Sequence, residues 1–332
     1  MKIEGSLGPL LQSFFAQHLL SYRRSSPQTV AAYRDTFRLF LAFLRKRHGR
    51  EPSRLCVEDV DTATVLAFLD HLETERNNSI RSRNARLAAI RSFFRFVAFR
   101  EPEHVALATQ ILAIPVKRAD RRLVGYLTRE EIEALLAAPD RASWAGRRDH
   151  ALLLTLYNTG ARVSEVAALR RSQFSPGASA FVVLHGKGRK ERSVPLWPKT
   201  ARALTAWFSE LGGAADGPAF PNAQGAPLTR DGVRYILDAA FAIAAENQPS
   251  LRGKNISPHV LRHTTAMHLL QAGVDCSVIA LWLGHESLQT THVYVEADLV
   301  TKEKALAKLA PPPVTVRRFK PDDALLGFLA TL

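Results

Sequence analysis

The stretch from residue 113 to residue 125 divides this chain into two parts with different patterns. It contains Pro115 and four basic residues, and its apolar residues follow no helical spacing. A chain of 332 residues is long enough for two domains, each with its own core. We therefore expect a first domain over residues 1–112, an extended basic linker over 113–125 and a second domain over 126–312.

Helix signals fill the first domain. Ser26 followed by Pro27 is a typical helix start, because serine accepts a backbone hydrogen bond and proline suits the first helical position. Residues 57–72 form a second amphipathic segment, and residues 79–100 carry apolar side chains at spacings of three and four. The first domain is therefore predicted to be all helical.

The third of these segments carries only positive charge. Between Arg76 and Arg100 the chain has seven arginines and no acidic residue. A solvated helix usually mixes both signs, so this segment indicates an anionic partner, with an ordinary basic surface as the alternative. The net charge of +14 favours nucleic acid, and double-stranded DNA is the partner we expect. The candidate DNA contacts are Arg81, Arg83, Arg86 and Arg91.

The second domain combines helical segments with a hairpin. Thr128 and Glu131 form a capping-box pattern that begins a helix. Residues 181–184 and 192–196 contain strand-forming residues and flank a glycine-containing turn, which predicts an antiparallel hairpin. Further helices are expected over residues 151–157, 229–245, 258–272, 278–283 and 299–309. The predicted fold class is mainly α, with an all-helical first domain and an α+β second domain that holds a small antiparallel sheet.

The C-terminal tail, residues 313–332, follows a run of proline residues that ends the second domain. Four leucines between residues 321 and 332 would form the apolar face of a short helix. This helix could dock on a neighbouring protomer or pack back onto its own domain.

A tyrosine near the end of the chain follows an ordered series of basic residues. The series is Arg162, Lys187, His259, Arg262 and His285, and the tyrosine is Tyr294. Attack on a phosphodiester builds negative charge on its nonbridging oxygens, so a catalyst needs fixed cations and an acid for the leaving oxygen. Arginine suits the first task because its planar fork holds two oxygens and stays charged. A phenol can form a covalent ester with phosphorus, although a tyrosine in a helix more often packs in a core.

His259 and Arg262 lie three positions apart and therefore share one face of a helix. Ser257 as the cap and Pro258 as the first residue place His259 in the first turn, where free backbone N–H groups favour an anion. This arrangement indicates a phosphate site. His263 fits an ordinary structural histidine better.

Lys187 lies between Gly186 and Gly188 at the tip of the predicted hairpin. A flexible glycine turn could carry this lysine to the leaving oxygen of a phosphodiester. Arg189 and Lys190 are competing candidates for the same task.

Glu165 follows Arg162 by about one helical turn, near the start of a predicted helix. Its carboxylate could hold the guanidinium in a fixed orientation. The alternative is an ordinary ion pair, worth roughly a few tenths of a kcal/mol.

These motifs, in this order over about residues 128–310, resemble the tyrosine recombinase (phage integrase) family. The first domain resembles the core-binding, SAM-like domain of that family. The resemblance implies that Tyr294 attacks the scissile phosphate, forms a 3′-phosphotyrosyl bond and frees a 5′-hydroxyl. It further implies that Arg162 and Arg262 hold the nonbridging oxygens, Lys187 protonates the leaving oxygen, His259 assists proton transfer and His285 donates a hydrogen bond to the phosphate.

The resemblance also implies no cofactor, because the covalent ester conserves the energy of the phosphodiester bond. The sequence shows no P-loop pattern and no paired-carboxylate cluster for metal-assisted hydrolysis. Family members act as tetramers on two DNA sites. Residues 266–303 resemble recombinases that are carried by transposons, some of them encoded as adjacent trios, so sister recombinases are expected partners.

Three other functions remain as alternatives. A DNA-binding protein without catalysis would keep the basic segments and use Tyr294 for packing. A type IB topoisomerase would use similar chemistry, but the small helical first domain favours a recombinase. A zinc hydrolase would use His259, His263 and His268, but no His-Glu-x-x-His pattern and no carboxylate ligand accompany them.

The remaining sequence signals indicate a cytoplasmic protein that acts at the nucleoid. Cys56 and Cys276 show neither metal-ligand spacing nor a disulfide framework, as in a reducing compartment. No apolar run is long enough to cross a bilayer, and the N-terminus does not have the pattern of a signal peptide.

Overall fold

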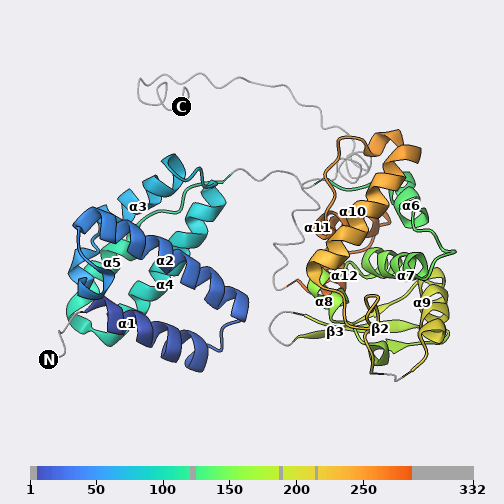
Figure 1. The fold of residues 1–332 in the computed structure, drawn as a ribbon, viewed down its shortest axis with the longest axis horizontal. Helices are drawn as coiled ribbons and strands as arrows, with labels where there is room; N and C mark the ends of the chain where they lie inside the picture. The colour runs from blue at the N-terminus through green and yellow to red at the C-terminus, as the bar shows by residue number, and fades with distance from the viewer. Residues whose placement is uncertain (1–5, 120–124, 187–189, 214–215, 286–332) are drawn as a thin grey trace, which may run out of the picture. The chain divides into compact units, whose positions relative to one another are not determined.

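The computed structural model describes residues 6–119, 125–186, 190–213 and 216–285. The chain divides into two compact units, Met1–Arg122 and Leu123–Leu332. Both units are built mainly from helices, and the second also holds a small sheet (Figure 1).

The first unit is a succession of helices joined by short connections. Its elements are α1 (Leu7–Ser13), the π-helix η1 (Phe14–Tyr22), α2 (Pro27–His48), the 3-10 helices η2 (Pro52–Arg54) and η3 (Val57–Asp59), α3 (Thr62–Thr74), α4 (Ile80–Arg100), η4 (Pro102–His104) and α5 (Val105–Ala113). The predicted starts of α2 and α4 are confirmed, because Ser26 and Ser79 each cap the helix that follows.

The second predicted helix begins later than the sequence pattern indicated. Val57–Asp59 forms the short helix η3, and α3 starts only at Thr62. Asp61 accepts a hydrogen bond from the backbone N–H of Thr64 at 2.7 Å, so it caps α3 and separates it from η3. The prediction overlooked this cap because Val57 and Val60 continue the apolar spacing, and both are buried.

Aromatic side chains form much of the core around α4. Phe93 of α4 packs edge-on against Phe14 and Phe37, with ring centroids 5.5 and 5.4 Å apart. Phe40 of α2 contacts Phe68 of α3 at 4.8 Å. α4 is therefore the central helix of this unit, and only part of its circumference is open to solvent.

The second unit combines helices with a three-stranded antiparallel sheet. Its elements are α6 (Arg129–Ala137), α7 (Trp144–Thr159), α8 (Val163–Ala167), η5 (Arg171–Gln173), β1 (Phe174–Ser175), β2 (Phe181–His185), β3 (Glu191–Pro195), α9 (Pro198–Leu211), α10 (Arg230–Asn247), η7 (Pro249–Leu251), α11 (Pro258–Gln271) and α12 (Cys276–Leu283). The strand order is β1-β2-β3, and Leu184 lies opposite Arg192 in the hairpin. The apolar helix α7 packs against α9 and α11.

The sequence predicted most of these elements. The hairpin and the capping box of α6 are confirmed, but β1 and α9 were not predicted. α9 was not predicted because its N-cap residue is Trp197, which makes no side-chain cap hydrogen bond, so the sequence there lacks the usual Ser, Thr, Asp or Asn cap. The helices predicted over 299–309 and 321–332 lie outside the described residues.

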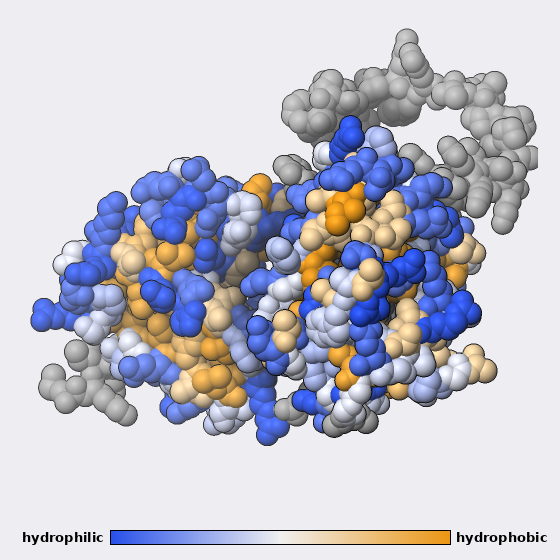
Figure 2. Space-filling model, turned by 45° about the vertical axis from the view of Figure 1, so that its right-hand side comes forward, coloured by the Kyte–Doolittle hydropathy of each residue, from blue (hydrophilic) through white to orange (hydrophobic). Residues whose placement is uncertain are grey.

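Polar side chains make up most of the surface that Figure 2 draws, with hydrophobic residues showing between them in orange. Lys and Arg outnumber Asp and Glu by 45 to 31, and charged side chains are rarely fully buried, so the surface charge is mainly positive. Within the described ranges, no helix combines the length and the apolar character that a membrane span requires.

Candidate active site

The end of α12 is the place where several predicted site residues meet. Three consecutive backbone carbonyls accept hydrogen bonds from arginines: Trp282 from Arg192 at 2.9 Å, Leu283 from Arg262 at 2.6 Å and Gly284 from Arg162 at 3.2 Å. The last carbonyls of a helix lack partners within the helix and lie at its negative end, so guanidinium groups are favourable there. Side chains from α11, from β3 and from Arg162, the N-cap residue of α8, thus converge on one helix end. Figure 1 shows where these elements lie in the second unit.

Arg262 is the most deeply placed of these arginines, with 4% of its surface exposed. It lies on α11, which begins at Pro258 behind the cap Ser257, as predicted. Its Nη1 donates to the carbonyl of Gly160 at 2.6 Å, and its Nη2 donates to the carbonyl of Leu283. Arg262 therefore joins the end of α7 to the end of α12.

Gly160 allows these two helix ends to approach each other. It ends α7 in the left-handed conformation, with φ of +58°. A Cβ added at Gly160 would lie 2.4 Å from Cδ2 of Leu283, which is far inside van der Waals contact. Only glycine satisfies both the backbone angle and the close approach.

Glu165 is buried between two of the arginines, and 2% of its side chain is exposed. It accepts hydrogen bonds from the backbone N–H of Arg162 at 2.9 Å and from Nη1 of Arg162 at 2.8 Å. Arg192 donates to both carboxylate oxygens, at 2.7 and 3.2 Å. Burial raises the pKa of Glu165, but the hydrogen bonds and charges of Arg192 and Arg162 outweigh this effect and hold the pKa below its usual value.

Three histidines lie beside the arginines. The rings of His259 and His263 are in T-shaped contact, with centroids 4.7 Å apart. Burial, followed by the charges of Arg262 and Arg162, lowers the pKa of His285 to about 4. Burial lowers the pKa of His263 to about 4, and electrostatic interactions with His259 and Arg262 act in the same direction. Partial burial and the same two arginines also lower the pKa of His259, so all three rings are mainly neutral at pH 7.

Two of the predicted catalytic residues, Lys187 and Tyr294, lie outside the described residues. The residues on either side of 187–189 are described: the N–H of Gly186 donates to the carbonyl of Lys190 at 2.7 Å. A Cβ at Gly186 would lie 3.3 Å from Oε1 of Glu165. Gly186, the last described residue before Lys187, therefore lies next to the carboxylate that binds Arg162 and Arg192.

Arg192 was not among the predicted site residues, although the sequence held a signal for it. It lies two positions before the buried Val194 and opposite the buried Leu184, so it belongs to the buried face of β3. An arginine in that position needs a buried acceptor, and Glu165 is such an acceptor.

His268 is a buried residue whose contacts indicate a structural role. Its Nδ1 lies 2.8 Å from the hydroxyl of Tyr157, and both side chains are buried. In the part of the chain that the structure describes, no group of three or more histidine, cysteine or acidic side chains is arranged to hold a metal ion.

The arginines of α4 differ in their surroundings, and Arg83 is the most enclosed of the four predicted DNA contacts. Only 3% of its side chain is exposed, and its Nε lies 3.0 Å from Glu73 of α3. Because the acidic partner comes from a neighbouring helix, a search within α4 alone could not find it. Buried pairing of this kind makes Arg83 a structural residue of the first unit.

The other predicted DNA contacts are more accessible. Arg81 is exposed, and Arg86 is partly buried. Arg91 is also partly buried, and its guanidinium donates to the carbonyl of Ile114. The exposed Arg81 is therefore the strongest candidate of the four for contact with a polyanion.

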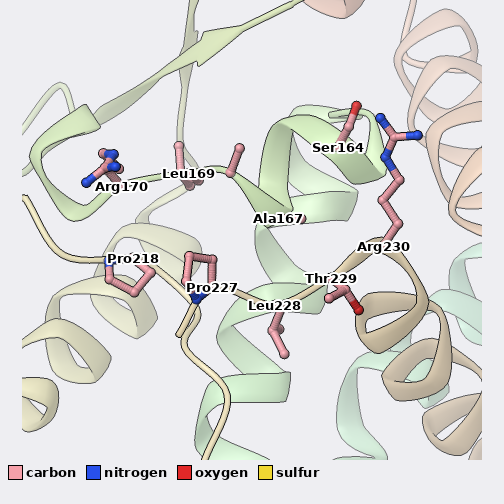
Figure 3. A pocket seen from close by; sticks show the side chains of 10 residues that line it. Ser164, Ala167, Leu169, Arg170, Pro218, Pro227, Leu228, Thr229 and Arg230 are labelled. Carbon is pink, nitrogen blue, oxygen red and sulfur yellow. The ribbon is translucent and has the colours of Figure 1, made fainter. Parts of the chain in front are cut away.

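A cavity of about 450 Å³ adjoins α8 and the start of α10. Figure 3 shows Arg170 and Arg230 at opposite ends of it, with Ser164 of α8 near the Arg230 end. The described residues that line this cavity do not include the arginines or histidines gathered at the end of α12. The cavity is therefore separate from the candidate active site, although it adjoins the same helix, α8.

Comparison with known proteins identifies the family. Residues 125–299 match the Phage integrase family, and residues 12–101 match the Phage integrase N-terminal SAM-like domain. The protein y4rC of Sinorhizobium fredii, which is named an integrase/recombinase, is 51% identical over 332 residues and 100% of both chains. Tyrosine recombinase XerC of Pelobacter propionicus is 37% identical over 88% of this chain and 92% of its own.

The fold is also similar to that of a solved recombinase. The crystal structure of XerH bound to palindromic difH substrate in a post-cleavage complex has a TM-score of 0.70 and 22% sequence identity, over 86% of this chain and 81% of that chain. The chain belongs to the phage integrase family, the family of the tyrosine recombinases. The predicted family and the predicted fold class, mainly helical with a small antiparallel sheet, are both confirmed.

Proposed function

We propose that this protein is a site-specific DNA recombinase that cuts and rejoins DNA strands through Tyr294. The observation that carries the proposal is the convergence of Arg162 and Arg262, from distant parts of the sequence, on the end of α12 beside His285. Two fixed guanidinium groups beside a neutral histidine suit the nonbridging oxygens of a phosphodiester. The first unit would grip the duplex, and the second unit would carry the chemistry.

The proposed reaction is a transesterification. The oxygen of Tyr294 attacks the scissile phosphorus and loses its proton to His259, which is accessible at the surface and mainly neutral. The bond from phosphorus to the 5′-oxygen breaks, and Lys187 gives that oxygen a proton. The products are a 3′-phosphotyrosyl bond and a free 5′-hydroxyl. Attack by a 5′-hydroxyl from a second strand reverses the process and rejoins the DNA.

The electrostatics of the described residues support this chemistry. Arg162 and Arg262 stay charged, and their orientations are set by the carbonyls of Gly284, Gly160 and Leu283. Prepositioned donors stabilise the negative charge that develops in the transition state without reorganising during the reaction. Because the covalent ester conserves the phosphodiester energy, the reaction requires neither a nucleotide nor a metal ion.

The partner in this proposal is double-stranded DNA, bound at two sites by a homo-tetramer. XerH, whose fold is similar, was crystallised with its palindromic difH substrate, and this supports DNA as the ligand. Sister recombinases of the same element are further proposed partners. A protein with this substrate works in the cytoplasm, at the nucleoid.

The test is covalent trapping on nicked duplexes, in which cleavage releases a short strand and prevents rejoining. The wild-type chain would first select its own sites from a pool of duplexes with a randomised core, and the trapped sequences would then be used individually. We expect a band of reduced mobility on a denaturing gel, formed equally with and without a chelator.

The matched variants are Tyr294→Phe and Tyr235→Phe. Tyr235 is exposed on α10 and has no part in the proposal, so Tyr235→Phe should form the band normally. Tyr294→Phe should form none. Specific DNA binding by the wild-type chain without any covalent band would instead support a DNA-binding protein that does not catalyse.

A further inference from the structure

Arg192 connects three parts of the candidate active site through one guanidinium. Its Nη2 and Nη1 donate to Glu165 at 2.7 and 3.2 Å, and its Nε donates to the carbonyl of Trp282 at 2.9 Å. The added Cβ of Gly284 would lie 3.0 Å from Nη1 of Arg192, so the backbone after α12 packs directly on this guanidinium. The side chain of Arg192 is 11% exposed, so it has little access to an external ligand.

The charges around Glu165 show what Arg192 contributes. Glu165 is one buried negative charge, and Arg162 and Arg192 are its two positive neighbours. The group of three therefore has a net charge of +1. Arg162 is the more accessible arginine, with 37% of its side chain exposed, whereas Arg192 is enclosed. The surplus positive charge thus lies on the arginine that can reach a phosphate.

We propose that Arg192 is a positioning residue that compensates the charge of Glu165, so that Arg162 keeps its own charge available for the scissile phosphate. This inference rests on the proposed function and extends it to a residue outside the set predicted from the sequence. Glu165 fixes the direction of Arg162 by holding its backbone N–H and Nη1. Without a second cation, that same carboxylate would neutralise Arg162, because an unpaired buried carboxylate attracts the nearest positive charge strongly.

The same contacts give Arg192 a second positional effect. β3 carries Arg192 and is the strand that follows Lys187 in the chain. Binding of Arg192 to Glu165 of α8 and to Trp282 of α12 therefore fixes the start of β3 against both helices. The two effects are separable, because only the second acts through Lys187, the proposed acid for the leaving oxygen.

The experiment measures single-turnover cleavage of a nicked duplex that the wild-type chain has been shown to cut, together with affinity for the same duplex. For Arg192→Gln we expect cleavage to fall roughly 10- to 100-fold, because Glu165 would then reduce the charge that Arg162 offers to the transition state. We expect affinity to change less than about threefold. Arg192→Lys keeps the charge and should retain most of the rate. The double variant Arg192→Gln with Glu165→Gln removes both charges and should cleave about tenfold faster than Arg192→Gln alone.

A second substrate separates the two effects. A duplex with sulfur in place of the bridging 5′-oxygen has a leaving group that needs no proton, so it restores a reaction that lacks only the acid. We expect this substrate to leave the Arg192→Gln defect in place. Full restoration would overturn the charge proposal and assign the defect to the turn of Lys187.

Two controls keep the result interpretable. Arg147→Gln breaks a more exposed ion pair with Glu210 and should cleave like the wild type. Thermal unfolding of each variant shows whether it is folded at the assay temperature. If Arg192→Gln is folded and the added Glu165→Gln change gives no recovery, the proposal is wrong. If the wild type forms no covalent product on any duplex, it is the proposed function that fails.

Discussion

Arg162 and Arg262 bind neighbouring carbonyl oxygens at the end of α12, those of Gly284 and Leu283. The two arginines are a hundred residues apart in sequence, yet one helix end binds both. They differ in burial, because Arg262 is 4% exposed and the side chain of Arg162 is 37% exposed. The site therefore combines one arginine that also supports the fold with one that faces outward.

This difference predicts that the two arginines affect stability unequally. Arg262→Ala leaves the carbonyls of Gly160 and Leu283 without this donor, at about 1–3 kcal/mol for each buried acceptor. Arg162→Ala leaves Glu165 bound to Arg192 and should cost about 1 kcal/mol. Both variants should lose covalent trapping.

Urea unfolding followed by tryptophan fluorescence measures this difference, because all four tryptophans of the chain lie in the second unit. Both variants replace an arginine by alanine and so remove the same chemical group, and each therefore serves as the control for the other. Equal losses of unfolding free energy would contradict the assignment of a structural role to Arg262.

Gly160 is predicted to tolerate no side chain. Gly160→Ala adds the left-handed backbone cost of about 1–2 kcal/mol to overpacking of about 1–3 kcal/mol against Leu283. Gly273 also has a positive φ, but a Cβ there meets nothing within 4 Å, so Gly273→Ala should lose only the backbone contribution. Fluorescence-detected urea unfolding compares the two, and similar losses would mean that α7 and α12 are not in close contact.

Local signals predicted much of the fold, and the site was predicted through its residue types. Caps such as Ser26, Ser79 and Ser257 act within four residues, so the sequence reveals them directly. The binding of arginines to the end of α12 depends on tertiary packing, which no local pattern encodes. The sequence did not reveal the burial of Arg83 for the same reason, because its partner Glu73 lies on another helix.

The histidines predict a loss of stability in mild acid. His263 has a pKa of about 4 in the folded protein and about 6.5 when unfolded. The unfolded chain therefore binds more protons between these values, so the unfolding free energy falls as the pH drops from about 6.5 to about 4. His285, also with a pKa of about 4, acts in the same direction.

His263→Phe isolates this effect, because phenylalanine replaces a buried ring without a titrating group. Urea unfolding at several pH values between 4 and 7 should show a smaller pH slope for the variant than for the wild type. Parallel slopes would rule out a depressed pKa at His263.

Arg81 and Arg83 are predicted to have separate roles although they are close in sequence. Arg81 is exposed, so Arg81→Ala should lower the slope of log affinity against log salt by about one without changing stability. Arg83→Ala removes a buried partner of Glu73 and should cost roughly 1–3 kcal/mol of unfolding free energy. DNA binding at several salt concentrations measures the first effect, and urea unfolding monitored by circular dichroism measures the second. An unchanged salt slope for Arg81→Ala would remove α4 from the proposed DNA surface.

The most direct test of the central claim is to find the amino acid that becomes linked to DNA. Trapped complex would be digested with nuclease and protease, and the modified peptide would be sequenced by mass spectrometry. The account predicts a nucleotide joined through its 3′-phosphate to Tyr294, with the other five tyrosines of the chain unmodified. A nucleotide on any other residue, or linkage through a 5′-phosphate, would contradict the account.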